Sequence, residues 1–175
     1  MEESLRGQLL IAAPSLFDYF RRTVVLVIEH NEEGAMGVVL NRPSETTVAE
    51  AVSALAELAD DGDHVQVGGP VSPESVVALG EFEDPDDAVS PVVGNLGLLD
   101  PDAPEPALGR LRVYAGYAGW GPGQLEGEIE QGAWIVECAD PEDPFKDGDL
   151  WAEALQRKGG AYSLLATMPS DPSLN

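Results

Sequence analysis

The amino-acid sequence predicts a single α+β domain spanning residues 1–175, and three observations carry this prediction. A chain of 175 residues, 43% of them hydrophobic, has the size and composition of one ordinary core. The turn formers NEEG at Asn31–Gly34 separate two apolar runs, which indicates an antiparallel hairpin. Many short strand-like runs alternate irregularly with about three helical patterns, which favours a mixed, largely antiparallel sheet flanked by helices over a doubly wound sheet.

The strands are predicted from apolar or alternating runs bounded by turn residues. They are expected at Gly7–Pro14, Thr23–His30, Ala35–Asn41, Ser75–Phe82, Arg110–Tyr117 and Ala133–Cys138. In addition, His64–Val71 is expected to be a short strand that enters a glycine turn. Gly37, inside the third run, indicates a bulge or a close backbone approach. Loops are expected where proline, acidic or turn residues gather, at Asn41–Thr47, Glu83–Asp87 and Pro101–Gly109.

The helices are predicted from their end signals. Thr47 and Glu50 match a capping box, so the first helix is expected from Val48 to about Ala59. The second is expected to begin at Pro122 and to close at Gly132, with Leu125 and Ile129 on one face.

The third helix is expected over Leu150–Lys158, capped by Asp149 and ended by Gly159. Its buried stripe would be Leu150, Trp151, Ala154 and Leu155. Beyond it, Leu164 and Leu165 are expected to pack, and MPSDPSLN is expected to be loosely ordered.

The net charge of the chain bears on which kinds of partner it can bind. Nine Lys and Arg against 32 Asp and Glu give a net charge of −23, which disfavours direct binding to nucleic acid or to an anionic membrane. The basic clusters are short: Arg21 with Arg22, and Arg110 with Arg112. The acidic start MEESLRG is unlike a signal peptide, and the apolar runs are too short to span a membrane, so a cytoplasmic protein is expected.

The glycine-rich stretch GYAGWGPGQLEGEI, residues 116–129, raises the question of a phosphate loop. Gly119, Gly121 and Gly123 read G-x-G-x-G, and Gln124 stands where a dinucleotide fingerprint needs its third glycine. Pro122 also removes a backbone donor that an anion would use. The stretch is therefore interpreted as a tight strand-to-helix turn under packed aromatic residues.

No stretch indicates a metal, a cofactor or a catalytic constellation. EHNEEG, residues 29–34, places carboxylates beside His30, but side chains in a hairpin turn mostly diverge, and His64 is the only other histidine. With neither histidine in a recognisable triad context, no catalytic residue is assigned. Cys138, the only cysteine, is expected to be an inert buried thiol.

Arg42 in the tripeptide NRP allows two interpretations. Structural ion pairs are the common use of arginine, so a salt bridge to an acidic loop is expected first. The alternative is a guanidinium that recognises a carboxylate or phosphate in a cleft, together with the backbone of Gly68 and Gly69.

Four blocks in order and register carry a family resemblance: GAMGVVLNRP (residues 34–43), GGPV (68–71), GYAGWGPGQLEGEI (116–129) and GAW (132–134). Together they resemble the YqgE/AlgH family of bacterial proteins. The resemblance implies a bent, branching sheet rolled into a pseudo-barrel. The family carries a label as a transcriptional regulator of alginate synthesis genes. It has no established catalytic residue or cofactor that could be assigned to this chain. This chain has Leu79-Gly80 where members often have a Leu-His pair, and its C-terminal segment also departs from many members.

The favoured functional interpretation is a cytoplasmic regulatory or interaction protein with an unidentified protein partner or small ligand. The alternatives are an enzyme of unknown reaction that uses the same cleft and, third, a DNA-binding regulator. The candidate cleft residues are Asn41, Arg42, Pro43, Gly68, Gly69, Pro70, Tyr117, Gly119 and Trp120.

Overall fold

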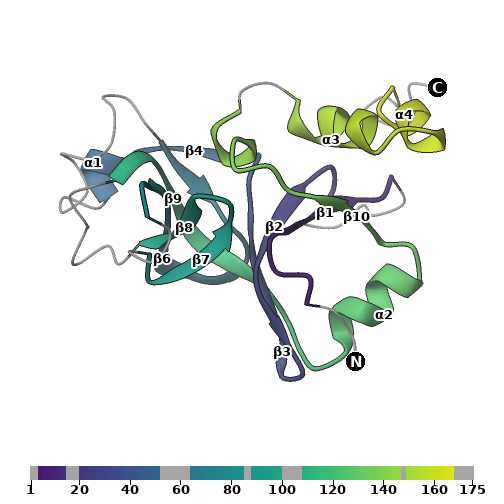
Figure 1. Ribbon diagram of the computed structural model, residues 1–175, viewed down its shortest axis with the longest axis horizontal. Coiled ribbons are helices and arrows are strands. Elements are labelled where there is room, and N and C mark those ends of the chain that lie inside the picture. The colour runs from purple at the N-terminus through teal and green to yellow at the C-terminus, as the bar shows by residue number, and fades with distance from the viewer. Residues whose placement is uncertain are drawn as a thin grey trace.

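A ten-stranded sheet forms the centre of the computed structural model, which describes residues 4–14, 20–51, 64–84, 88–99, 108–146 and 149–167 (Figure 1). The strands are β1 Gln8–Ala12, β2 Val24–Asn31, β3 Gly34–Val39, β4 Pro43–Thr47, β5 His64–Val67, β6 Val71–Phe82, β7 Ser90–Val93, β8 Leu96–Leu99, β9 Leu108–Trp120 and β10 Trp134–Cys138. The helices are α1 Val48–Ala51, α2 Gln124–Glu130, α3 Leu150–Lys158 and α4 Ala161–Leu165, with a 3₁₀ turn, η3, at Asp143–Phe145. The predicted α+β class is confirmed.

The sheet branches at β9. Its main path runs β10-β1-β2-β3-β9-β6-β8-β7 with antiparallel neighbours, while β4 and β5 form an antiparallel pair off this path. The long strand β9 pairs with β3 near its end, with β6 along most of its length, and in parallel with β5 at Tyr114 and Ala115. Figure 1 shows the result: β1, β2 and β10 lie on one side of the molecule, β4, β6, β7 and β8 lie with α1 on the other, and β9 reaches from there to β3.

The two ends of the sheet approach each other without pairing. A Cβ built on Gly7, just before β1, would lie 2.7 Å from the carbonyl oxygen of Val92 in β7. Gly94, in the turn after β7, lies against Pro141 just beyond β10, because a Cβ there would be 2.6 Å from the proline Cγ. The sheet is thus rolled but not closed by a ladder between β7 and β10.

Helices cover both faces of the β1–β2–β3 layer, which explains why LLIA and VVLVI are continuous apolar runs rather than alternating ones. Leu9 and Ile11 face Trp151 and the rest of α3, whereas Leu10 and Ala12 face the opposite side with α2. A third apolar cluster fills the other half of the sheet and includes Val48 at the start of α1.

Two end signals in the sequence correspond to observed helix starts. The Glu50 backbone N–H donates to Thr47 Oγ1 at 3.3 Å where α1 begins, and the Ala152 N–H donates to Asp149 Oδ1 at 3.0 Å where α3 begins. The α3 bounds and its four buried residues are as predicted. The remainder of the first predicted helix, residues 52–59, lies outside the described residues.

The β2–β3 hairpin is also confirmed, with its register shift opposite Gly37. A Cβ on Gly37 would lie 2.6 Å from Val25 Cγ1, so the close approach that the glycine indicated is present.

Several sequence-based boundaries are wrong for identifiable reasons. Pro43–Thr47 is a strand, not a loop, because it pairs with β5 in tertiary structure. By contrast, His64–Val71 is a short strand that enters a glycine turn, as predicted: β5 ends at Val67, and Val71 already belongs to β6. The hairpin of β7 and β8 was not predicted, since its strands have four residues each and little periodicity.

The glycine-rich stretch contains the predicted strand-to-helix turn, but the ends of its two elements differ from the prediction. β9 continues to Trp120, and α2 begins at Gln124 rather than at Pro122, after Gly123 in the left-handed conformation with φ 74°. A residue in the left-handed conformation cannot belong to a right-handed helix, so the helix begins only after Gly123 and Pro122 lies in the turn before it. Gly132 closes α2 with φ +81°, as predicted.

Candidate functional site

The glycine-rich blocks of the sequence meet where the sheet branches. The Gly68 N–H donates to the Ala115 carbonyl at 2.9 Å, and the Val39 N–H donates to the Gly68 carbonyl at 2.8 Å. Gly68 and Gly69 lie so close to β9 that a Cβ on Gly68 would be 2.3 Å from the Gly116 oxygen, and one on Gly69 would be 2.1 Å from the Tyr117 carbonyl carbon. Glycines are needed here so that two backbones can touch.

Asn41 and Arg42 hold the segment that enters β2. Asn41 Oδ1 accepts from the Val24 N–H at 3.0 Å, and its Nδ2 donates to the Arg22 carbonyl at 2.9 Å, so its amide continues the ladder beyond β3. Arg42 Nη2 donates to the Arg21 carbonyl at 3.3 Å. Arg22 itself has φ 56°, uncommon for a residue with a side chain, and these contacts support it.

The remaining candidates spread away from this point. Pro43 starts β4 opposite Gln66, Pro70 is exposed, and Gly119 is exposed on β9. Tyr117 packs beside the α3 cluster, whereas Trp120 is in the α2 cluster on the other face, because residues three apart on a strand point to opposite sides. The structure thus brings Gly68, Gly69 and Tyr117 together and separates them from Trp120. Their role as a ligand site stays a prediction.

Trp120 belongs to an aromatic cluster organised by one carboxylate. The indole Nε1 atoms of Trp120 and Trp134 donate to Glu128 Oε1 at 3.0 and 2.9 Å, and Gln124 Nε2 donates to Oε2 at 2.9 Å. Phe20 completes the cluster, with ring centroids 6.5 Å from Trp120 and 5.6 Å from Trp134. The rings contact each other, so the cluster is a packed joint between α2 and the sheet.

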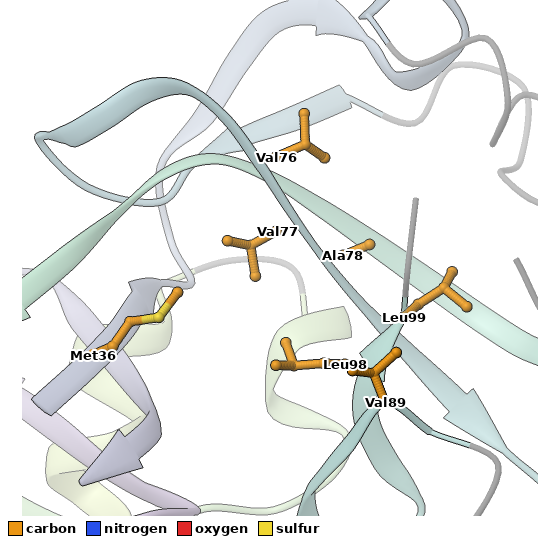
Figure 2. Close-up of a pocket in the computed structure, with 7 residues that line it drawn as sticks. All are labelled: Met36, Val76, Val77, Ala78, Val89, Leu98 and Leu99. Carbon is orange, nitrogen blue, oxygen red and sulfur yellow. The ribbon is translucent and has the colours of Figure 1, made fainter. Parts of the chain in front are cut away.

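A hollow of about 230 Å³ opens where β3 approaches the β6–β8 half of the sheet. Figure 2 shows its lining: Met36 from β3 reaches toward Val77 and Leu98, and Val89 lies beside Leu98. All seven lining side chains are apolar: Met36, Val76, Val77, Ala78, Val89, Leu98 and Leu99. None of the nine residues predicted from the sequence lines this hollow.

The rim of the hollow carries exposed apolar side chains. Val76 is 37% exposed and Val89 is 69% exposed. Sequence reasoning missed this site, because its residues come from four separate segments, and a lone valine on a strand carries no signal of exposure.

A break in the β6–β9 ladder lies next to the hollow. The register shifts between Val71 and Val76, so residues 72–75 bulge out of the sheet. Ser72 opens the bulge with φ 44°, a left-handed conformation that is rare for serine. Glu74 is exposed on this bulge, two residues before Val76.

The ionised groups with perturbed pKa values lie in two networks around η3. Arg110 Nε donates to Glu81 Oε1 at 2.8 Å, and this hydrogen bond lowers the pKa of the Glu81 carboxyl. Asp143 is buried; burial alone would raise its pKa, but hydrogen bonds from Arg157 at 2.6 and 3.0 Å and from the Asp140 N–H hold the pKa below its usual range. Arg110 Nη2 also pairs with Glu142, directly before η3, so the two networks fasten η3 to β9 and to α3.

Tyr114 has a different environment. Its side chain is fully buried in the α3 cluster, and burial raises the pKa of its hydroxyl. No described residue hydrogen-bonds to that hydroxyl.

Cys138 and His30, two residues considered in the sequence analysis, differ in their exposure. Cys138 is exposed, contrary to the expectation of a buried thiol, because it is the last residue of β10. The His30 ring is buried and its Nδ1 accepts from the Leu5 N–H at 2.9 Å, while Nε2 lies 3.5 Å from Glu126 Oε1. Within the described ranges, no three His, Cys, Asp or Glu side chains are placed to share a metal ion.

The helices described here are all too short or too polar to cross a membrane.

Comparison with known proteins adds family and fold. The model of the family described as AlgH-like matches residues 9–163. A UPF0301 protein of Streptomyces coelicolor is 47% identical over 98% of this chain and 96% of its own length, and one of Mycobacterium leprae is 43% identical over 97% and 90%.

Two solved structures share the fold. The crystal structure of a Corynebacterium diphtheriae protein superposes with a TM-score of 0.87 at 31% identity, covering 96% of this chain and 94% of that one. The solution structure of the AlgH protein from Pseudomonas aeruginosa superposes with a TM-score of 0.69 at 30% identity, covering 97% and 98%. The branched sheet, its glycine contacts and these matches agree, and the chain belongs to the AlgH-like family.

Proposed function

We propose that this chain is a protein-interaction module that receives one apolar anchor side chain of a partner protein in the hollow between β3, β6 and β8. The observation that carries the proposal is the lining, in which all seven side chains are apolar. A pocket of this kind gains affinity by removing apolar surface from water.

The size of the hollow favours a single side chain as its occupant. Its volume of about 230 Å³ is below the ~300–1,000 Å³ typical of small-molecule sites. The hollow is also larger than an engineered protein cavity of ~150 Å³ that is known to bind benzene. An aromatic or large aliphatic side chain therefore fits, and the exposed Val76 and Val89 offer further contact area around it.

The chemistry of the lining favours binding over catalysis at this place. Acid–base and nucleophilic catalysis need a titratable or nucleophilic side chain within hydrogen-bond reach of the substrate. The lining residues offer methyl, methylene and thioether groups. An enzymatic use of the hollow would have to bring its reactive groups from elsewhere.

Indole, the side chain of tryptophan, is a direct probe of the proposal. Titrating indole into methyl-labelled protein should shift the NMR signals of Met36, Val77 and Leu98 saturably. Val76→Trp should occupy the hollow and weaken indole binding at least about tenfold, equivalent to about 1.4 kcal/mol.

Val71→Trp is the matched control. Val71 lies on the same strand and is 36% exposed against 37% for Val76, but it does not line the hollow. Equal effects of the two substitutions, or saturable shifts confined to another part of the molecule, would contradict the proposal. If a metabolite bound the hollow more tightly than any peptide, the occupant of the hollow would be a small ligand and not a side chain of a partner protein.

A further inference from the structure

We infer that the segment of the partner that enters the hollow is basic, with its apolar anchor flanked by Lys or Arg. This inference rests on the proposed function, and it adds the chemistry of the occupant. It follows from the charge of the chain and from the bulge that carries Glu74.

Acidic residues bracket the lining along the chain. Glu74 precedes Val76 by two residues, and Glu83 and Asp84 follow the lining segment of β6. All three are exposed. With a net charge of −23 on the whole chain, a partner that approaches this side meets a negative field.

Arg6 is the cation beside the hollow. Its Nη2 contacts the Ser90 hydroxyl and the Pro91 carbonyl, directly after Val89 in the chain. These neutral partners leave its positive charge in place. The negative field that a partner meets therefore comes from the excess of 32 Asp and Glu over nine Lys and Arg in the whole chain and from the exposed Glu74.

The bulge carries one of these acids, Glu74, two residues before the lining residue Val76. Residues 72–75 leave the ladder between Val71 and Val76, and Ser72 adopts its strained conformation there. A bulge re-aims the side chains that it carries, and here Glu74 is exposed next to the exposed Val76. An apolar site with a flanking acid matches an apolar side chain with a flanking Lys or Arg.

Charge also decides against a second copy of this chain as the occupant. A second copy would bring a further net charge of −23 to the same interface. Like charge on both partners opposes association unless it is screened.

Selection from a random peptide display library tests the inference, with the intact chain as bait. Peptides retained by the wild type and lost on Val76→Asp, but not on Val71→Asp, are the hollow binders. We expect these to combine an aromatic or large aliphatic residue with an excess of Lys and Arg. Their affinity should fall at least about tenfold as ionic strength rises from about 0.01 M to 1 M, because the Debye length shrinks from about 30 to 3 Å.

Glu74→Lys tests the charge on the bulge. Glu130→Lys is its control, because it makes the same change of charge at an exposed position on α2. We expect Glu74→Lys to weaken the selected peptides by more than Glu130→Lys does.

The outcomes separate the two proposals. The inference is overturned, and the proposed function stands, if the hollow binders have no excess of Lys and Arg. The same holds if Glu74→Lys and Glu130→Lys weaken their affinity equally. A selection whose binders are all indifferent to Val76→Asp overturns both. Concentration-dependent dimerisation that Val76→Asp abolishes would make a second copy the occupant and would likewise overturn the inference.

Discussion

Gly69 lies directly against the backbone of Tyr117, so that a Cβ on Gly69 would stand 2.1 Å from the Tyr117 carbonyl carbon and 2.4 Å from the Ala118 nitrogen. Backbone atoms cannot move aside as a flexible side chain can. This contact fixes how the segment between β5 and β6 crosses β9, and with it the branch of the sheet.

Gly69→Ala should therefore destabilise the fold strongly, by about 3 kcal/mol or more. Gly127→Ala is the control, because Gly127 lies within α2 and nothing approaches its Cβ position within 4 Å. There the alanine should raise the free energy of unfolding by about 0.5–1 kcal/mol. Urea denaturation measures both, and a Gly69→Ala variant as stable as the wild type would refute the backbone contact.

Glu128→Ala should loosen the joint between α2 and the sheet. It leaves the buried indole N–H groups of Trp120 and Trp134 without their shared acceptor, which costs about 2 kcal/mol. Near-ultraviolet circular dichroism and tryptophan fluorescence report on this cluster directly. Glu128→Gln keeps an acceptor oxygen and should lose clearly less stability; equal losses for the two variants would mean that the hydrogen bonds contribute little.

Asp143 gives the stability a defined pH dependence. Its pKa is lowered in the folded chain, so its contribution is fully present above the unfolded-state pKa of about 3.9 and is lost as pH falls through the lower folded pKa. The stability difference between wild type and Asp143→Asn should be constant near neutral pH and shrink below about pH 4. A difference that stays unchanged through that range would show that Asp143 is not paired in its ionised form.

Arg157→Met tests the other partner of this pair. It leaves the Asp143 carboxylate buried with Lys146 Nζ at 3.5 Å. We expect a loss of about 2 kcal/mol, less than the ~3–5 kcal/mol for a fully buried pair because the Arg157 side chain is 27% exposed. The exposed Arg6 offers a control: Arg6→Met should cost less than about 1 kcal/mol in the same chemical denaturation experiment.

Tyr114→Phe should leave stability unchanged or raise it by up to about 1 kcal/mol. The hydroxyl is buried and finds no acceptor or donor among the described residues, so its removal ends a desolvation cost without breaking a hydrogen bond. Thermal unfolding of the two proteins decides the point. A marked loss of stability would reveal a polar partner for this hydroxyl.

Local signals in the sequence were sufficient for elements whose ends and periodicity are specified by neighbouring residues. Helix α3 follows from Asp149, an apolar stripe and Gly159, and the β2–β3 hairpin follows from its turn residues. The same local reasoning placed the start of α2 too early, because Pro122 suits a first helical turn but the left-handed Gly123 determines the direction of the chain.

The sequence by itself determined the α+β class, the family blocks and the net charge of the chain, because these depend on composition, short-range pattern and residue order. Only the tertiary structure decided that Gly68 and Gly69 serve a backbone crossing, that Tyr117 and Trp120 face opposite sides of β9, and that seven scattered apolar residues share one hollow. Those facts depend on which strands become neighbours and in which register. Residues far apart in the chain set both, and no local periodicity encodes them.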